Sequence, residues 1–110
     1  SALSLTNMNV AISTITTTGF RATLTAEAGN FNKSIKGAGW VASDFALYNN
    51  TSDATVVITS ATETAVGSGD YDFVVPAQTS LDSLTLSGAV TGAVLTKAPF
   101  ELVATTFDVP

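Results

Sequence analysis

The chain has 110 residues and a net charge of −5, and it contains eighteen threonines but neither histidine nor cysteine. The absence of imidazole and thiol side chains excludes the commonest general bases, nucleophiles and zinc ligands, so we expect no enzyme and no cofactor, and we assign no residue to a metal site. Only four basic residues are present, too few to neutralise a nucleic-acid backbone or to hold an anionic membrane surface. We therefore expect neither nucleic acid nor membrane as a partner.

Length and composition predict one folded domain over residues 1–110. Apolar residues make up 45% of the chain, enough for a core without disulfides, whereas charged residues make up only 12%. The polar surface must therefore come from threonine, serine and asparagine. A hydroxyl-rich, charge-poor surface favours a virion or an extracellular, cell-surface location.

The first segment of the chain alternates apolar and polar residues, which predicts a β-strand. Its apolar positions change phase, because Leu3 and Leu5 are odd whereas Met8 and Val10 are even. A phase change turns side chains to the other face of a sheet. We therefore expect a bulge, a break or a crossing between sheets near Asn7.

The same period of two recurs through the middle of the chain, with glycine, asparagine and proline between the segments. Pro76 cannot continue a central strand and is expected to end one. Seven or eight short strands of this kind predict a single antiparallel β-sandwich, and the sequence leaves open whether its strand order is immunoglobulin-like or jelly-roll-like. Central strands are expected over residues 20–26, 45–48, 55–59, 70–75 and 83–87.

The last segment changes phase as the first does, because Phe100 and Leu102 are even but Phe107 is odd. Terminal strands can pair within their own fold or add to the open sheet of a neighbour. We take both outcomes as open. The candidate assembly residues on these strands are Leu3, Leu5, Met8, Val10, Phe100, Leu102 and Phe107.

The longest stretch without strand periodicity is residues 27–39, EAGNFNKSIKGAG, followed by Trp40. Long loops in compact domains often carry function. The loop could bind a partner, or it could cross between sheets with its apolar residues tucked beneath it and Trp40 in the core. The candidate partner-binding residues are Phe31, Lys33, Ile35, Lys36 and Trp40.

Asp70 and Asp72 lie on one face of an expected strand. Carboxylate oxygens are calcium ligands, so the pair could contribute to a Ca²⁺ site. The spacing is not that of an EF-hand loop, and Asp-x-Asp is equally typical of a solvated strand. The sequence leaves both interpretations open.

Residues 44–87, DFALYNNTSDATVVITSATETAVGSGDYDFVVPAQTSLDSLTLS, resemble bacterial and phage immunoglobulin-like domains of the Big and fibronectin type III kind. The shared pattern is an aromatic strand, a short Val/Ile strand, a glycine turn, an aromatic strand ending in proline, and a Leu-x-Leu strand. The chain lacks both cysteines of antibody-type domains. The resemblance implies a structural or binding module and assigns no functional residue.

These observations favour a non-catalytic assembly protein, a virion component such as a phage capsid decoration or tail protein. Its partners would be other protein subunits, either copies of itself in a homo-oligomer or a scaffold such as a capsid. The alternative is a secreted or cell-surface immunoglobulin-like accessory module that binds carbohydrate or protein. Exposure of Trp40, Tyr48 or Tyr71 would favour the alternative, since sugar binding requires an aromatic platform, and burial of all three would count heavily against it.

Overall fold

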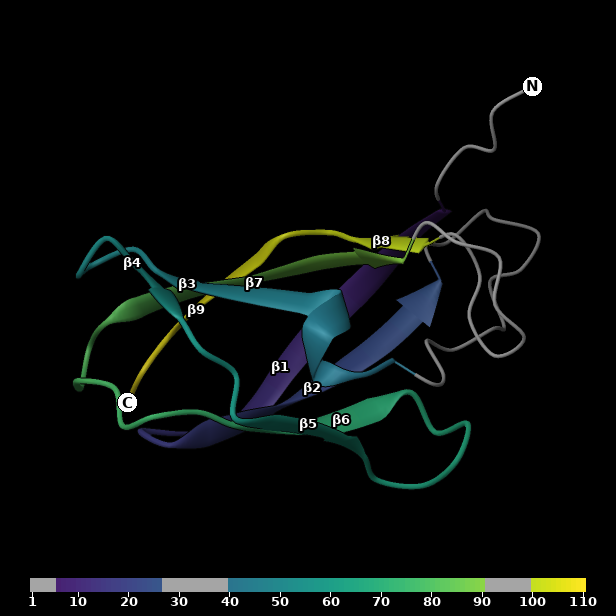
Figure 1. The fold of residues 1–110 in the computed structure, drawn as a ribbon, viewed down its shortest axis with the longest axis horizontal. Coiled ribbons are helices and arrows are strands. Elements are labelled where there is room, and N and C mark those ends of the chain that lie inside the picture. Colours follow the sequence, from purple (N-terminus) through teal and green to yellow (C-terminus); the bar gives the residue numbers. More distant parts are fainter. Residues whose placement is uncertain (1–5, 27–39, 91–99) are drawn as a thin grey trace.

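The computed structural model describes residues 6–26, 40–90 and 100–110, which form β-strands, short connections and one turn of 3₁₀ helix (Figure 1). Within these ranges no helix has the length and apolar character needed to cross a membrane. The helical turn, η1, spans Ala42–Asp44. The strands are β1 (Thr6–Thr16), β2 (Gly19–Ala26), β3 (Phe45–Asn49), β4 (Ala54–Val56), β5 (Ser60–Glu63), β6 (Asp70–Val74), β7 (Ser83–Val90), β8 (Phe100–Leu102) and β9 (Thr105–Asp108).

The strands form one curled, mixed sheet in the order β4-β3-β7-β8-β1-β2-β6-β5, with β9 paired to β7. The curl brings β3, β4, β7 and β9 over β2, β5 and β6 (Figure 1). The predicted all-β class is confirmed, although the described residues contain nine strands instead of seven or eight. The prediction of a purely antiparallel sheet is wrong at one pair, because β1 and β8 run parallel. Strand partners depend on tertiary packing, which alternation within a strand does not encode.

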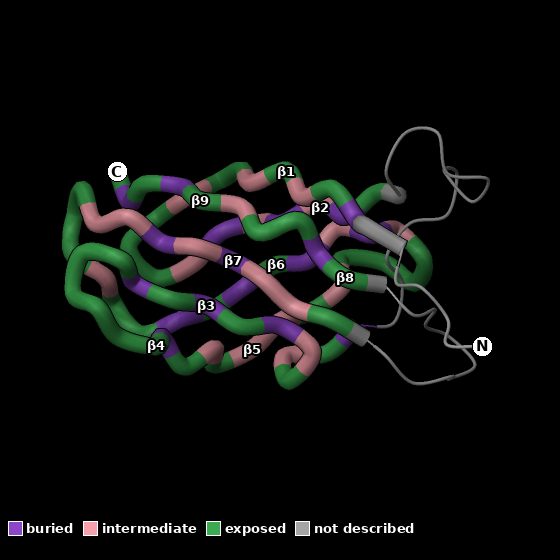
Figure 2. The backbone as a smooth tube through the Cα atoms, turned by 90° about the horizontal axis from the view of Figure 1, so that it is seen from above, coloured by how far each residue is buried: buried purple, intermediate pink, exposed green. Residues whose placement is uncertain are grey.

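The core lies between the two halves of the curled sheet, and the alternation predicted for the central strands places it there. Buried and exposed residues alternate along β3 (Figure 2). Phe73 on β6 stacks on Phe20 of β2 at 4.6 Å between ring centroids and meets Phe45 of β3 edge-on at 4.8 Å. The buried apolar residues are Met8, Phe20, Ala22, Leu24, Trp40, Phe45, Leu47, Val56, Tyr71, Phe73, Val75, Leu84, Leu86, Leu102, Phe107 and Val109.

Only the second of the two predicted phase changes can be compared with the structure, because Leu3 and Leu5, which define the first, lie outside the described residues. Strand β1 is continuous from Thr6, and its register against β2 shifts between Ser13 and Thr16. At the other end of the chain, β8 pairs with both β1 and β7, whereas β9 pairs with β7 alone. The break between Leu102 and Thr105 therefore moves the chain from one half of the sheet to the other, as the second phase change predicted.

Gly88 allows a close approach of β7 to the start of β3. It pairs with Phe45, and a methyl group in place of its hydrogen would overlap the backbone oxygen of Asp44. Only glycine fits there without moving the chain. The same contact holds η1 against β7 and so places Trp40, which precedes η1, over the core.

Candidate functional site

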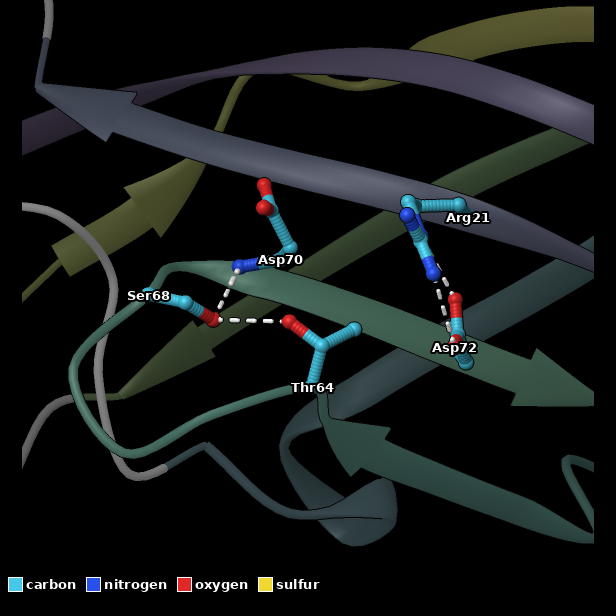
Figure 3. A network of polar contacts seen from close by, with 5 residues as sticks. All are labelled: Arg21, Thr64, Ser68, Asp70 and Asp72. Carbon is cyan, nitrogen blue, oxygen red and sulfur yellow. Dashed lines mark hydrogen bonds and ion pairs between the residues drawn. The ribbon is translucent and has the colours of Figure 1, made fainter.

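The outer face of β2 and β6 carries an ion pair between Arg21 and Asp72, which are cross-strand partners (Figure 3). The guanidinium donates two parallel hydrogen bonds, from Nε to Oδ1 at 2.7 Å and from Nη2 to Oδ2 at 3.1 Å. This hydrogen bonding lowers the pKa of Asp72 and raises the pKa of Arg21. Both side chains are exposed, so water and salt weaken the pair. It orients two charges on the surface and does not create a reactive group.

Asp70 lies on the same face, next to the turn that joins β5 to β6 (Figure 3). Its backbone N–H donates to Ser68 Oγ at 3.2 Å, and Ser68 Oγ lies 3.1 Å from Thr64 Oγ1. Arg21 engages both oxygens of Asp72, and no three His, Cys, Asp or Glu side chains within the described ranges are placed to hold one metal ion. The Asp72 carboxylate is therefore engaged in an ion pair, and calcium binding at Asp70 and Asp72 stays a prediction.

Trp40 and Tyr71 are joined in the interior beneath η1. Trp40 is 3% exposed and its ring centroid lies 5.2 Å from that of Phe45. The Trp40 backbone N–H donates to the Tyr71 hydroxyl at 2.9 Å, and burial raises the pKa of Tyr71 to about 12. Trp40 Nε1 is buried without a hydrogen-bond partner among the residues that the structure describes. Of the two roles predicted for Trp40, the structure therefore shows the core residue and not the exposed partner-binding residue.

Tyr48 is the third of the aromatic residues whose exposure would favour sugar binding. It is 37% exposed on β3, and its hydroxyl donates a hydrogen bond to Asp53. That hydrogen bond raises the pKa of Tyr48. Because Trp40 and Tyr71 are buried, neither can stack on a sugar ring together with Tyr48. Of the three aromatic residues, Tyr48 therefore meets the condition of exposure, and Trp40 and Tyr71 do not.

Asn49 is a buried polar residue at the end of β3 that sequence reasoning missed. Its Nδ2 donates to Gln78 Oε1 at 3.0 Å and to Asp82 Oδ2 at 2.9 Å, and its Oδ1 accepts from the Ser52 backbone N–H at 2.9 Å. The amide therefore ties the β3–β4 turn to the β6–β7 loop. No signal in the sequence distinguished Asn49 from its exposed neighbour Asn50.

Two open grooves flank β4, with volumes of about 410 and 300 Å³. No acidic or basic side chain is among the described residues that line either groove. These surfaces therefore offer shape and hydroxyl groups, not acid–base chemistry. The first groove is lined by Ala42, Ser43, Phe45, Ala46, Leu47, Thr55, Val56 and Ile58, and the second by Asn49, Ser52, Ala54, Thr55, Val56, Val57, Pro76 and Gln78.

The two end segments that carry the predicted assembly residues pair with each other inside the fold. β1 pairs with β8 over Thr6–Met8, and the side chains of Met8, Leu102 and Phe107 are buried in the shared core. Val10 is half-buried, and Phe100 belongs to β8. The other predicted residues lie outside the described ranges: Leu3, Leu5, Phe31, Lys33, Ile35 and Lys36.

No protein-family model and no curated protein matches the sequence. Two solved structures are similar in fold. The N-terminal part of the bacterial S-layer protein SbsC matches with a TM-score of 0.61 and 15% identity over 91% of this chain. A structure of domains 1–6 of surface layer protein SbsC matches with a TM-score of 0.58 and 14% identity over 94%. This chain spans 22% and 14% of those chains, and identities this low show likeness of fold alone.

Proposed function

We propose that the chain is a non-catalytic structural module of a cell-surface protein. The observation that carries the proposal is the similarity of fold over 91% of this chain to part of an S-layer protein. The hydroxyl-rich composition and the grooves free of charged lining residues support it. The extracellular location expected from composition belongs to the same proposal, whereas no finding supports the virion role.

The proposal includes an immunoglobulin-like sandwich as the architecture. Its two layers would be β1-β2-β6-β5 and β4-β3-β7-β9, with β8 joining β1 to β7. Aromatic contacts across the layers support this view, because Phe73 meets Phe45 of β3 and Phe20 meets Phe107 of β9. Because the similar chains are several times longer, the module would act beside other protein modules or subunits, which would be its partners.

The location can be tested by treating intact cells of the source organism with a protease and identifying the released peptides by mass spectrometry. Peptides of this chain released from intact cells, together with an intact cytosolic marker, are expected. Detection only after lysis would overturn the proposal. Recovery in purified phage particles, and absence from the surface of phage-free cells, would restore the virion role instead.

A further inference from the structure

One side of β1 is left open for part of its length. β2 pairs along β1 from Met8 to Thr16, whereas β8 covers only Thr6–Met8 on the other side. The last backbone contact on that second side is the hydrogen bond from Val103 N to Met8 O, at 2.9 Å. Beyond Met8, no described strand pairs with that side of β1.

The direction of the free backbone groups follows from this last contact. In an antiparallel strand, successive residues point their N–H and C=O groups to opposite sides. Met8 points its carbonyl toward β8, so Val10 and Ile12 point both backbone groups to the open side. Asn9, Ala11 and Ser13 point theirs toward β2.

The open edge has two definite ends. Val103 occupies the position beside Met8. At the other end, Thr14 has φ = 53°, and the register against β2 shifts between Ser13 and Thr16. Such a bulge bends a strand out of line. The stretch of β1 that can pair with a further strand is therefore residues 9–13.

The edge also lacks the charges that protect other edges. No residue before Arg21 is charged. By contrast, β5 contains Glu63, β9 contains Asp108, and Asp53 directly precedes β4. Exposed edges usually carry charges that prevent pairing between molecules. In a chain of net charge −5, this neutral edge lets two copies approach with the least repulsion.

We propose that this edge pairs with the same edge of a second copy, antiparallel, about a two-fold axis at Ala11. Val10 then faces Ile12 of the second copy, and Ile12 faces Val10, which gives four backbone hydrogen bonds. The half-buried side chains of Val10 and Ile12 extend the apolar surface from one copy to the other. Asn9 and Ser13 form the flanking polar pairs.

Self-pairing is favoured over a different partner strand because the edge is self-complementary. On either side of Ala11 lies one residue, Val10 or Ile12, with a free backbone N–H and a free C=O. A two-fold axis at Ala11 therefore gives every one of these groups a hydrogen-bond partner in the second copy. The pairing would join the two β1-β2-β6-β5 layers into one continuous sheet. A contact of five residues is small, so the association is weak in solution and gains strength only where many copies are held together.

An engineered cysteine tests the register directly, because the chain has no cysteine of its own. Ala11 is exposed and would face itself at a Cα separation of about 4.5 Å, which a disulfide can span. Under oxidation, Ala11→Cys is expected to form covalent dimers at least about tenfold faster than the exposed β2 control Thr25→Cys at equal concentration. Equal rates would overturn the proposal.

A mixture of Asn9→Cys and Ser13→Cys proteins sharpens the test. The register predicts disulfides between the two variants and few within either one, and homodimers of Asn9→Cys would contradict it. Uncross-linked protein is expected to gain mass in sedimentation equilibrium between about 5 µM and about 1 mM. Ala11→Lys should abolish this gain by placing two like charges on the axis, whereas Thr62→Lys on β5 should not.

A mass that stays monomeric at every concentration would also overturn the pairing. A gain in mass that Ala11→Lys leaves unchanged would do the same, because it would place the contact on another edge. Thermal unfolding of each variant confirms that the monomer fold is intact. The pairing does not depend on where the protein resides, so its failure is distinguishable from failure of the proposed cell-surface location.

Discussion

The hydroxyl of Tyr71 accepts a hydrogen bond of 2.9 Å from the backbone N–H of Trp40, a residue 31 positions earlier in the chain. Both residues are buried, at 0% and 3% exposure. A buried backbone donor that loses its acceptor keeps the cost of leaving water. The tyrosine hydroxyl therefore fixes the point at which the chain enters η1 and β3.

Tyr71→Phe is expected to lower the free energy of unfolding by about 1–3 kcal/mol, because the Trp40 N–H would lose its acceptor in the interior. Tyr48→Phe is the matched control, since it removes an exposed hydroxyl, and its effect should stay within about 0.5 kcal/mol. Urea denaturation followed by tryptophan fluorescence measures both. Equal effects of the two substitutions would show that the Trp40 contact does not stabilise the fold.

Alkaline pH should destabilise the protein through the same residue. Burial raises the pKa of Tyr71 from 10.0 to about 12, so the folded state favours the neutral phenol. This contribution is complete below pH 10 and is lost as pH rises toward 12, at most on the order of 3 kcal/mol. Unfolding free energies of wild type and Tyr71→Phe, measured from about pH 8 to about pH 12, should converge as pH rises. A constant difference would contradict the assignment.

Asn49→Ala should also destabilise the fold, by about 1–3 kcal/mol, because the buried amide has three partners. Its loss would leave the Ser52 N–H without its acceptor and release the β6–β7 loop. Asn50→Ala is the control, because that amide is exposed and bonds to the hydroxyls of Ser83 and Thr85. Chemical denaturation gives the stabilities. A larger effect at Asn50 than at Asn49 would contradict the role of burial.

At Leu81 we expect a substitution that stabilises the fold, in contrast to those at Tyr71 and Asn49. Its φ is 74° and its side chain is 81% exposed, so the backbone is strained without apolar burial in return. Leu81→Gly should raise the free energy of unfolding by up to about 1 kcal/mol, the relief of strain less the entropy that glycine gains on unfolding. Leu81→Ala keeps the Cβ and should not. Equal stabilisation by alanine would assign the gain to removal of an exposed apolar side chain instead.

The sequence predicted correctly those strands that have one buried face and one solvent-exposed face. Along β6, Tyr71 and Phe73 point inward and Asp72 outward as the period of two requires, and the strand ends before Pro76. The prediction joined Val56 and Ile58 in one strand, but β4 ends at Val56 and β5 begins at Ser60. An apolar pattern continues across such a break whenever the connecting residues also face the core.

Pairing and hydrogen-bond partners lay beyond sequence reasoning. A tyrosine on a buried face needs a partner for its hydroxyl, so Tyr71 carried a signal that some partner exists. That the partner is the Trp40 backbone depends on how η1 lies on β7. The parallel β1–β8 pair likewise depends on the curl of the sheet. Local patterns state which face is buried, and contacts between distant segments are decided by tertiary packing.

The parallel pairing of β1 with β8 also decides how the module would respond to tension. The chain enters β1 at Thr6, near one end of the molecule, and its last residue, Pro110, lies at the opposite end (Figure 1). A pull on the two ends is carried on the C-terminal side first by β9, which is paired with β7, and it then draws β8 along the length of β1. The hydrogen bonds between Thr6–Met8 and Phe100–Leu102 then share the load and must fail together, whereas an antiparallel terminal pair would peel apart one bond at a time.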